Sequence, residues 1–183
     1  MLNKDRYLTK SRFKEGLECP TKLYYSKNPK YQNNQLDDPF LESLAEGGYQ
    51  VGELAKFLIS DQPYIDDITV ESLDYQESIQ STNKKLKNKF ASIAEPAFLY
   101  KNLFIRVDLL QKKDDEINIY EVTSKSWGYE GVDDQEFKVF IKEYKRGENK
   151  GKRVIDPNWK FYLYDIAFQR YVVRNLFPEK KIN

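Results

Sequence analysis

The sequence predicts a mixed α/β (α+β) fold, in which a three-strand meander is flanked by helices. Its length of 183 residues suits one domain with a real hydrophobic core. Three consecutive apolar segments lie within residues 93–124, separated by short polar turns. Segments before and after them repeat apolar residues at spacings of three and four, which is the period of a helix. We therefore expect a single domain over residues 1–183.

Cap residues and apolar stripes place the helices. A short helix is expected to begin at Thr9 or Ser11 and to stop at Cys19-Pro20. Asp38-Pro39 fits the N-cap and first position of a long helix. A further helix is expected near residues 75–90. The apolar stripe of the long helix comprises Leu41, Leu44, Gly48, Val51, Ala55 and Leu58.

The strands are expected at residues 93–101, 103–111 and 116–124. Asn102 marks the first turn, and the polar KKDD segment at 112–115 marks the second. Residues 128–158 are polar and charged, so they are interpreted as an excursion from the domain. A final helix follows over residues 158–177. It is apolar around most of its circumference, as expected of a helix packed between a sheet and another layer.

The composition indicates a globular protein, with 40 % apolar, 15 % aromatic and 32 % charged residues. No apolar run is long enough to span a bilayer, and the N-terminus lacks the apolar segment of a signal peptide. A cytoplasmic location without a membrane partner is therefore expected.

Missing residue types exclude several chemistries. The chain has no histidine, which excludes a histidine general base, a catalytic triad and a histidine-ligated metal. Its single cysteine, Cys19, cannot form an intrachain disulfide or hold zinc or an iron–sulfur cluster alone. The chain also has no Gly-rich phosphate loop. Any catalysis must then come from carboxylates, lysines and hydroxyls, with or without a divalent ion.

Basic residues gather in two runs, although the net charge is only +1. Such runs can contact the phosphates of a nucleic acid. A solvated surface is the more common explanation. The runs are Lys84, Lys85, Lys87 and Lys89, and then Lys142, Lys145, Arg146, Lys150, Lys152 and Arg153.

Two neighbouring strands each carry one carboxylate. Because side chains alternate across a sheet, Asp108 should share a face with Arg106, opposite Leu103, Ile105, Val107 and Leu109. On the next strand, Glu121 should follow Ile117 and Ile119 on one face. Paired carboxylates repel unless a cation lies between them, and Mg²⁺ or Mn²⁺ bound by oxygen ligands would serve. The alternative is that Asp108 pairs with Arg106 or a facing lysine, and that Glu121 merely ends a strand.

The segment from Asp108 to Glu121-Val-Thr-Ser-Lys125 resembles the signature of the PD-(D/E)XK nuclease superfamily, in which an Asp on one strand precedes E-x-K on the next. LTKSRFKEGLECPTKLYY at 8–25 resembles the opening of its RecB-like branch. EGGYQVGELAK at 46–56, the strand beginning at Glu95, and DIAFQRYV at 165–172 follow in the family's order. The pattern is closest to a bacterial family of uncharacterised proteins with a predicted N-terminal nuclease domain.

This resemblance implies a restriction-endonuclease-like core with a central mixed sheet. It implies that Asp108 and Glu121 bind Mg²⁺ or Mn²⁺, assisted by the carbonyl of Val122 and by Glu95. It also implies that Gln169 leans toward the site and that DNA is the partner. A surface amide is the plainer explanation of Gln169.

The sequence also departs from that pattern. Thr123 occupies the place of the E-x-K lysine. The candidate catalytic lysine is therefore Lys125, which lies on the same strand face about 6.8 Å further along. The alternative is that the site has lost its activity. On the long helix, Gly52 stands where relatives carry an acid or histidine, while Glu46 and Glu53 lie on its polar side. The family's last strand should follow the Gln169 helix, but the sequence stops there at PEKKIN. We therefore expect either that this strand comes from a further domain or partner, or that the chain is a fragment.

Three functional hypotheses follow. The first is metal-dependent hydrolysis of DNA. The second is a catalytically inactive domain of the same fold that binds nucleic acid or acts as a scaffold, which would explain Thr123. The third is a protein-interaction domain without nucleic acid, favoured by the near-zero net charge; salt-sensitive DNA binding would exclude it.

Overall fold

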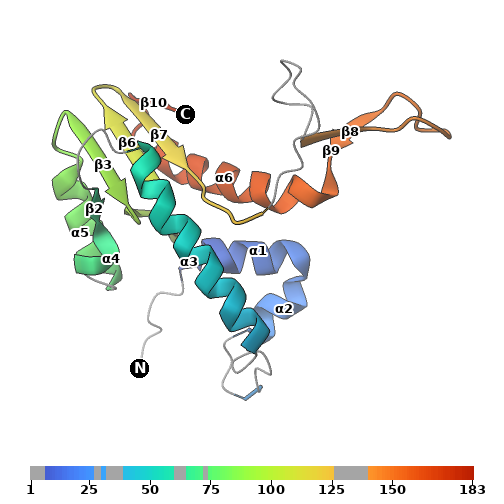
Figure 1. Ribbon diagram of the computed structural model, residues 1–183, viewed down its shortest axis with the longest axis horizontal. Helices are drawn as coiled ribbons and strands as arrows, with labels where there is room; N and C mark the ends of the chain where they lie inside the picture. Colours follow the sequence, from blue (N-terminus) through green and yellow to red (C-terminus); the bar gives the residue numbers. More distant parts are fainter. Residues whose placement is uncertain (1–6, 27–29, 32–38, 60–64, 72–73, 126–139) are drawn as a thin grey trace.

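The structure is a computed structural model that describes residues 7–26, 30–31, 39–59, 65–71, 74–125 and 140–183. It has a mixed α/β architecture, as the sequence predicts (Figure 1). The helices are α1 (Lys10–Glu18), α2 (Pro20–Tyr25), α3 (Pro39–Ile59), α4 (Ile68–Glu71), α5 (Tyr75–Lys85) and α6 (Pro157–Leu176).

The predicted meander forms the centre of a mixed sheet. Strands β3 (Phe90–Ala94), β6 (Leu109–Lys113) and β7 (Glu116–Tyr120) pair antiparallel in that order. Two short strands extend this sheet, one at each edge, and both are parallel to their neighbours. They are β2 (Asp66–Asp67) beside β3 and β10 (Lys181–Ile182) beside β7.

The first two predicted strands are each bent in the middle. Strands β4 (Ala97–Tyr100) and β5 (Leu103–Arg106) continue β3 and β6 beyond the bend, and β1 (Leu8–Thr9) adds to β5 in parallel. The hairpin keeps one register throughout, because the Glu95 N–H donates to the Asp108 carbonyl at 2.9 Å. Glu95 has a φ of 54°, a left-handed conformation that is uncommon for a glutamate. The bend therefore places Glu95 directly opposite Asp108.

The bend also changes which face a side chain occupies. Ile105 and Val107 point into the main core, as alternation predicts, but Leu109 packs against Ala55 and Ala94 on the other side. The prediction that Leu109 shares their face is wrong, since strict alternation holds only while a strand stays straight.

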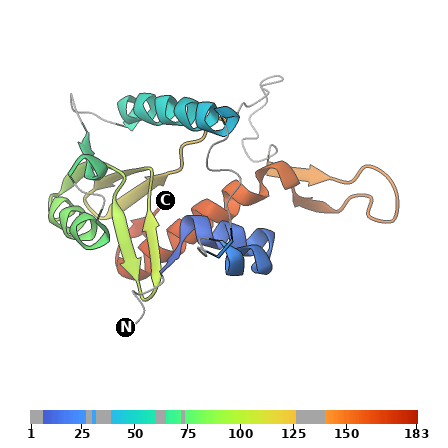
Figure 2. The same cartoon turned by 90° about the horizontal axis from the view of Figure 1, so that it is seen from below.

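The helices cover both faces of the bent hairpin. Helix α3 lies on one side, and α1 and α6 lie on the other (Figure 2). The main core fills the space between the strands and α6 and includes Phe98, Ile117 and Val172. A smaller cluster under α3 contains Ala55, Ala94 and Leu109. Side chains on the strands near the bend therefore pack into one of two separate clusters, one on each face of the hairpin.

Local caps explain the helix starts. The Thr9 side chain accepts from the Arg12 N–H, which confirms Thr9 as the cap of α1. Asp74 caps α5, and Asp156 caps α6 with Pro157 as its first residue. The predicted cap Asp38 lies outside the described residues.

Several predicted boundaries need correction. The helix expected to reach residue 90 ends at Lys85, because Phe90 begins β3. Leu58, assigned to the buried stripe of α3, is 87 % exposed. After the Gln169 helix, the chain's own residues 181–182 form a short strand, β10, beside β7.

The predicted polar excursion contains secondary structure. Residues 126–139 lie outside the described part of the chain, but residues 141–155 form a β-hairpin of β8 (Ile141–Glu143) and β9 (Arg153–Ile155). This hairpin projects away from the rest of the molecule (Figures 1 and 2). A search of the described residues finds no helix long and apolar enough to cross a membrane.

Candidate active site

Three carboxylates come together where the sheet bends. Register places Glu95 opposite Asp108 on one side, and the Leu109–Tyr120 pair places Glu121 beside Asp108 on the other. Asp108 is held in place because its Oδ2 accepts the Val122 N–H at 2.8 Å. Three neighbouring strand segments thus each contribute one acid at the same level of the sheet.

The ammonium of Lys10 lies between these acids and a fourth one. Its Nζ is 3.1 Å from Asp108 Oδ1, 2.9 Å from Glu121 Oε2 and 3.9 Å from Asp165 Oδ2. Lys10 is the first residue of α1, and the Thr9 cap at the end of β1 fixes where that helix begins. Because β1 pairs with β5, Lys10 lies beside the bend.

Helix α6 supplies the rest of the cluster on the same face. Asp165 and Gln169 are completely buried and one helical turn apart. The Gln169 amide donates to Glu121 Oε2 at 2.7 Å and to Asp165 Oδ1 at 3.1 Å, and Lys14 forms an ion pair with Asp165. The buried Gln169 Oε1 has no hydrogen-bond partner among the residues that the structure describes.

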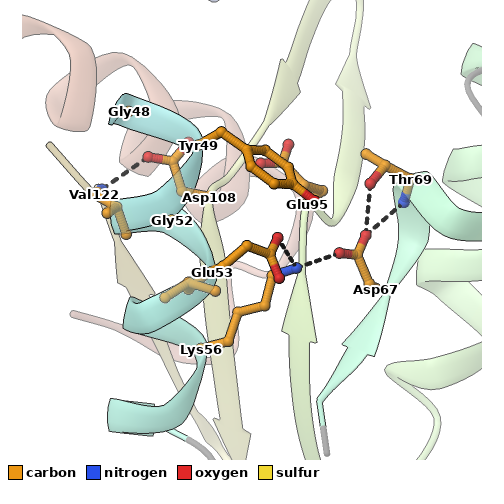
Figure 3. A pocket seen from close by; sticks show the side chains of 11 residues that line it. Gly48, Tyr49, Gly52, Glu53, Lys56, Asp67, Thr69, Glu95, Asp108 and Val122 are labelled. Atoms are coloured by element: carbon orange, nitrogen blue, oxygen red, sulfur yellow. Dashed lines mark hydrogen bonds and ion pairs between the residues drawn. The ribbon is translucent and has the colours of Figure 1, made fainter. Parts of the chain in front are cut away.

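A cavity of about 460 Å³ opens on the α3 side of Asp108. Glu95, Asp108 and Val122 line it together with Glu53 of α3 and Asp67 of β2 (Figure 3). Lys56 bridges the last two acids, with its Nζ 2.6 Å from Glu53 Oε1 and 2.6 Å from Asp67 Oδ2. Asp108 is therefore reached from both faces, by Lys10 on one side and by this cavity on the other.

The electrostatics of the site favour an additional cation. Lys10 pairs with Asp108, Glu121 and Asp165, Lys14 pairs with Asp165, and Glu95 lies opposite Asp108 within the field of Arg106. These four acids therefore face three positive charges, which leaves an excess of negative charge when all are ionised. Burial and then the charge of Asp108 raise the pKa of Glu95 to about 7.

The pKa values of Lys10 and Glu121 are both raised above their usual values. Burial raises the pKa of Glu121 to about 7, and Asp108 and Asp165 add to this while Lys10 opposes it. Burial lowers the pKa of Lys10, but Glu121, Asp108 and Asp165 outweigh it and raise that pKa above its usual value. Lys10 therefore stays charged, and its single charge does not neutralise the acids around it.

Most of the residues proposed from the sequence meet here. Asp108, Glu121, Glu95 and Gln169 lie in one cluster, and Val122 joins it through its N–H. Of the two acids considered on the long helix, Glu53 lines the cavity, whereas Glu46 is exposed and lies outside it.

The structure does not bring Lys125 to the carboxylates. Its ammonium lies over the rings of Trp159 and Tyr162, at 5.2 and 5.5 Å from their centroids. Lys10 contacts Asp108 and Glu121 instead, and Asp165 lies 3.9 Å from its ammonium. The sequence alone does not identify Lys10 or Asp165 as site residues. The motif at 8–25 assigns no role to Lys10, and nothing local connects residue 10 with residues 108 and 165.

The donor set suits a hard divalent cation, since all its side-chain ligands are oxygens. As they stand, no three acidic side chains among the described residues converge closely enough to hold a metal ion. Lys10 contacts both Asp108 and Glu121 at the position between them. An ion would therefore bind either after Lys10 swings aside or on the cavity side of Asp108, near Glu95.

Comparison with protein-family models, with curated proteins and with solved structures finds no match for this chain. The fold and site define it as a mixed α/β domain with a carboxylate–lysine–glutamine cluster at a bend in its sheet.

Proposed function

We propose that this chain is a metal-dependent nuclease of the PD-(D/E)XK type, in the RecB-like branch, which hydrolyses phosphodiester bonds of DNA. The observation that carries the proposal is the alignment of Glu95, Asp108 and Glu121 on adjacent strand segments, with a lysine and a buried glutamine against them. The motif order along the chain supports the same assignment, as does a mixed sheet extended at both edges by short parallel strands.

In this proposal the acids hold Mg²⁺ or Mn²⁺, with Asp108 and Glu121 as the main ligands and Glu95 and the Val122 carbonyl assisting. When bound, the ion would polarise the phosphate and lower the pKa of a coordinated water, which would make that water a better nucleophile. Gln169 orients Glu121 through its amide hydrogen bond. Lys10 stabilises the negative charge that builds up on the phosphate, which is the role that Thr123 cannot perform.

One observation favours a second function. Lys10 already pairs with Asp108, Glu121 and Asp165 and occupies the place between them. If that ammonium has permanently replaced the ion, the domain keeps the fold without hydrolysis. It would then bind nucleic acid or serve as a scaffold.

Metal titration separates these two functions. Mn²⁺ is titrated calorimetrically into the wild type, into Asp108→Asn/Glu121→Gln, and into the control Asp114→Asn/Glu116→Gln. The control removes two exposed acids at the tip of the same hairpin. Cleavage of labelled DNA is then followed with Mg²⁺ or Mn²⁺.

The nuclease proposal predicts binding and cleavage in the wild type and the control, and loss of both in the site variant. Circular dichroism checks that each variant is folded. Absence of Mn²⁺ binding in the folded wild type overturns the nuclease proposal and leaves the binding or scaffold function.

A further inference from the structure

The β8–β9 hairpin concentrates positive charge away from the acidic site. Residues 141–155, here named the basic arm, contain six Lys or Arg residues and two acids, a net charge of +4. The whole chain carries +1, so the rest of the protein carries −3. Residues 142–153 of the arm are all exposed. A phosphate backbone is thus attracted to the arm more strongly than to the rest of the chain.

The charge also lies unevenly on the two faces of the arm. Lys142 pairs with Val154 and Glu143 pairs with Arg153, while the Tyr144 N–H donates to the Lys152 carbonyl at 3.1 Å. Because side chains alternate along a ribbon, Lys142, Tyr144 and Lys152 share one face, and Glu143 and Arg153 offset each other on the opposite face. The first face carries an exposed aromatic ring between two lysines and no acid.

The arm is tied to the helix that completes the candidate active site. Strand β9 runs into the Asp156 cap of α6, the Asp156 N–H donates to the Phe140 carbonyl at 2.8 Å, and the Phe140 ring packs edge-on against Trp159. Asp165 lies nine residues further along α6, about 14 Å at the helical rise. In Figures 1 and 2 the arm extends beyond the N-terminal end of α6. The base of the arm therefore stands about 14 Å from the carboxylates.

We propose that the basic arm binds a single-stranded flank of the nucleic acid, with Tyr144 stacking on a base and Lys142 and Lys152 contacting phosphates on either side. A ring flanked by cations suits a single strand, since only unpaired bases expose their faces for stacking. The position of this flank relative to the cleaved bond rests on the proposed function. If the strand between them keeps the duplex rise of about 3.4 Å per nucleotide, the arm begins about four nucleotides from the carboxylates, and fewer if the strand is extended.

The binding test uses the full chain in EDTA, so that no cleavage occurs. Fluorescence anisotropy measures binding of a labelled 20-nucleotide single strand, and of the matching duplex, at several salt concentrations. The arm variant is Lys142→Ala/Tyr144→Ala/Lys152→Ala. The matched control, Lys101→Ala/Lys181→Ala/Tyr24→Ala, removes the same three side-chain types from exposed positions outside both basic runs.

We expect the arm variant to bind the single strand about ten-fold or more weakly, which is the range for losing one stacking ring. Its log affinity should also fall less steeply with log salt, by about 1.4, because two phosphate contacts are lost. The control should bind like the wild type. Equal binding by the arm variant and the control overturns the proposal, as does wild-type binding that favours the duplex.

The cleavage assay keeps this inference separate from the nuclease proposal. With Mg²⁺, the arm variant should need more single-stranded substrate for half-maximal rate but reach the same rate at saturation, since the arm contacts no reacting atoms. If the wild type cleaves nothing, the nuclease proposal fails, while the anisotropy result still decides what the arm binds.

Discussion

Lys10 is the residue on which the proposed chemistry depends, because its ammonium contacts Asp108 and Glu121 directly and faces Asp165. A cation held by several buried acids can either compete with a metal ion or assist it. The two roles predict opposite effects of removing it. Lys10 is thus the single position that best separates a working site from one that has lost its chemistry.

For Lys10→Ala we expect Mn²⁺ to bind at least as tightly as in the wild type, since a competing charge is gone. DNA cleavage at saturating metal should fall about 100-fold, the usual effect of removing one group that stabilises transition-state charge. Calorimetry and a cleavage assay measure the two quantities. The control is Lys22→Ala, which removes an exposed ion pair between Lys22 of α2 and Glu18 of α1. Faster cleavage by Lys10→Ala would show that the lysine only blocks the ion.

The raised pKa of Glu95 predicts a stability that depends on pH. Its value of about 7 lies above the usual 4.5, so the native state keeps a proton that the unfolded chain releases. The metal-free protein should therefore be most stable below about pH 4.5 with respect to this group, and lose stability as the pH rises through about 7.

Urea unfolding in EDTA at pH 5, 6, 7 and 8 measures this dependence. Glu95→Gln should reduce the loss, while the exposed control Glu148→Gln should leave it unchanged. The chain has no histidine, so the groups that can titrate in this window are the shifted carboxylates, the terminal amine and the Cys19 thiol, whose pKa is lowered by backbone hydrogen bonds from Lys22 and Thr21. A wild-type stability that rises from pH 5 to 7 would contradict the expectation.

At the scale of elements, the contact between α5 and the strand after the bend holds the hairpin in its bent form. The Thr82 hydroxyl is completely buried, accepts the Ala97 N–H at 2.9 Å and donates to the Ser78 carbonyl at 2.8 Å. Ala97 is the first residue of β4, immediately after Glu95-Pro96. One hydroxyl therefore links the helix to the segment that positions Glu95.

Thr82→Val keeps the shape of the side chain but leaves the buried Ala97 N–H without its acceptor. We expect it to lower the free energy of unfolding by about 1–3 kcal/mol, the usual cost of an unsatisfied buried donor. Thr82→Ser keeps the hydroxyl and loses only a methyl group, so it should cost less, on the order of 1 kcal/mol. Urea unfolding compares the two, and an equal loss in both variants would contradict the role of the hydrogen bond.

At the scale of the whole molecule, a metal ion that binds only the native site should stabilise the entire domain. At a free Mn²⁺ concentration 100 times the dissociation constant, the free energy of unfolding should rise by about 2.7 kcal/mol. Urea unfolding with and without Mn²⁺ measures this change. Asp108→Asn/Glu121→Gln should show no rise. An equal rise in that variant would place the ion elsewhere on the protein.

The sequence by itself determined the parts of this protein that depend on neighbours along the chain. The β6–β7 hairpin follows from alternation and the polar KKDD segment, and it is enough to bring Asp108 beside Glu121. The starts of α1 and α6 follow from their cap residues. The absence of histidine confined the candidate chemistry to carboxylates and lysines.

Only the tertiary structure decided which cation stands at the site and how the strands bend. Lys10 is 98 residues from Asp108 in the chain, and it arrives there because β1 pairs with β5 and α1 packs near α6. The bend at Glu95 depends on buried contacts such as that of Thr82 with Ala97, and β10 depends on the path of the chain after α6. Periodicity and caps report only local preferences, whereas these features arise from packing between distant segments.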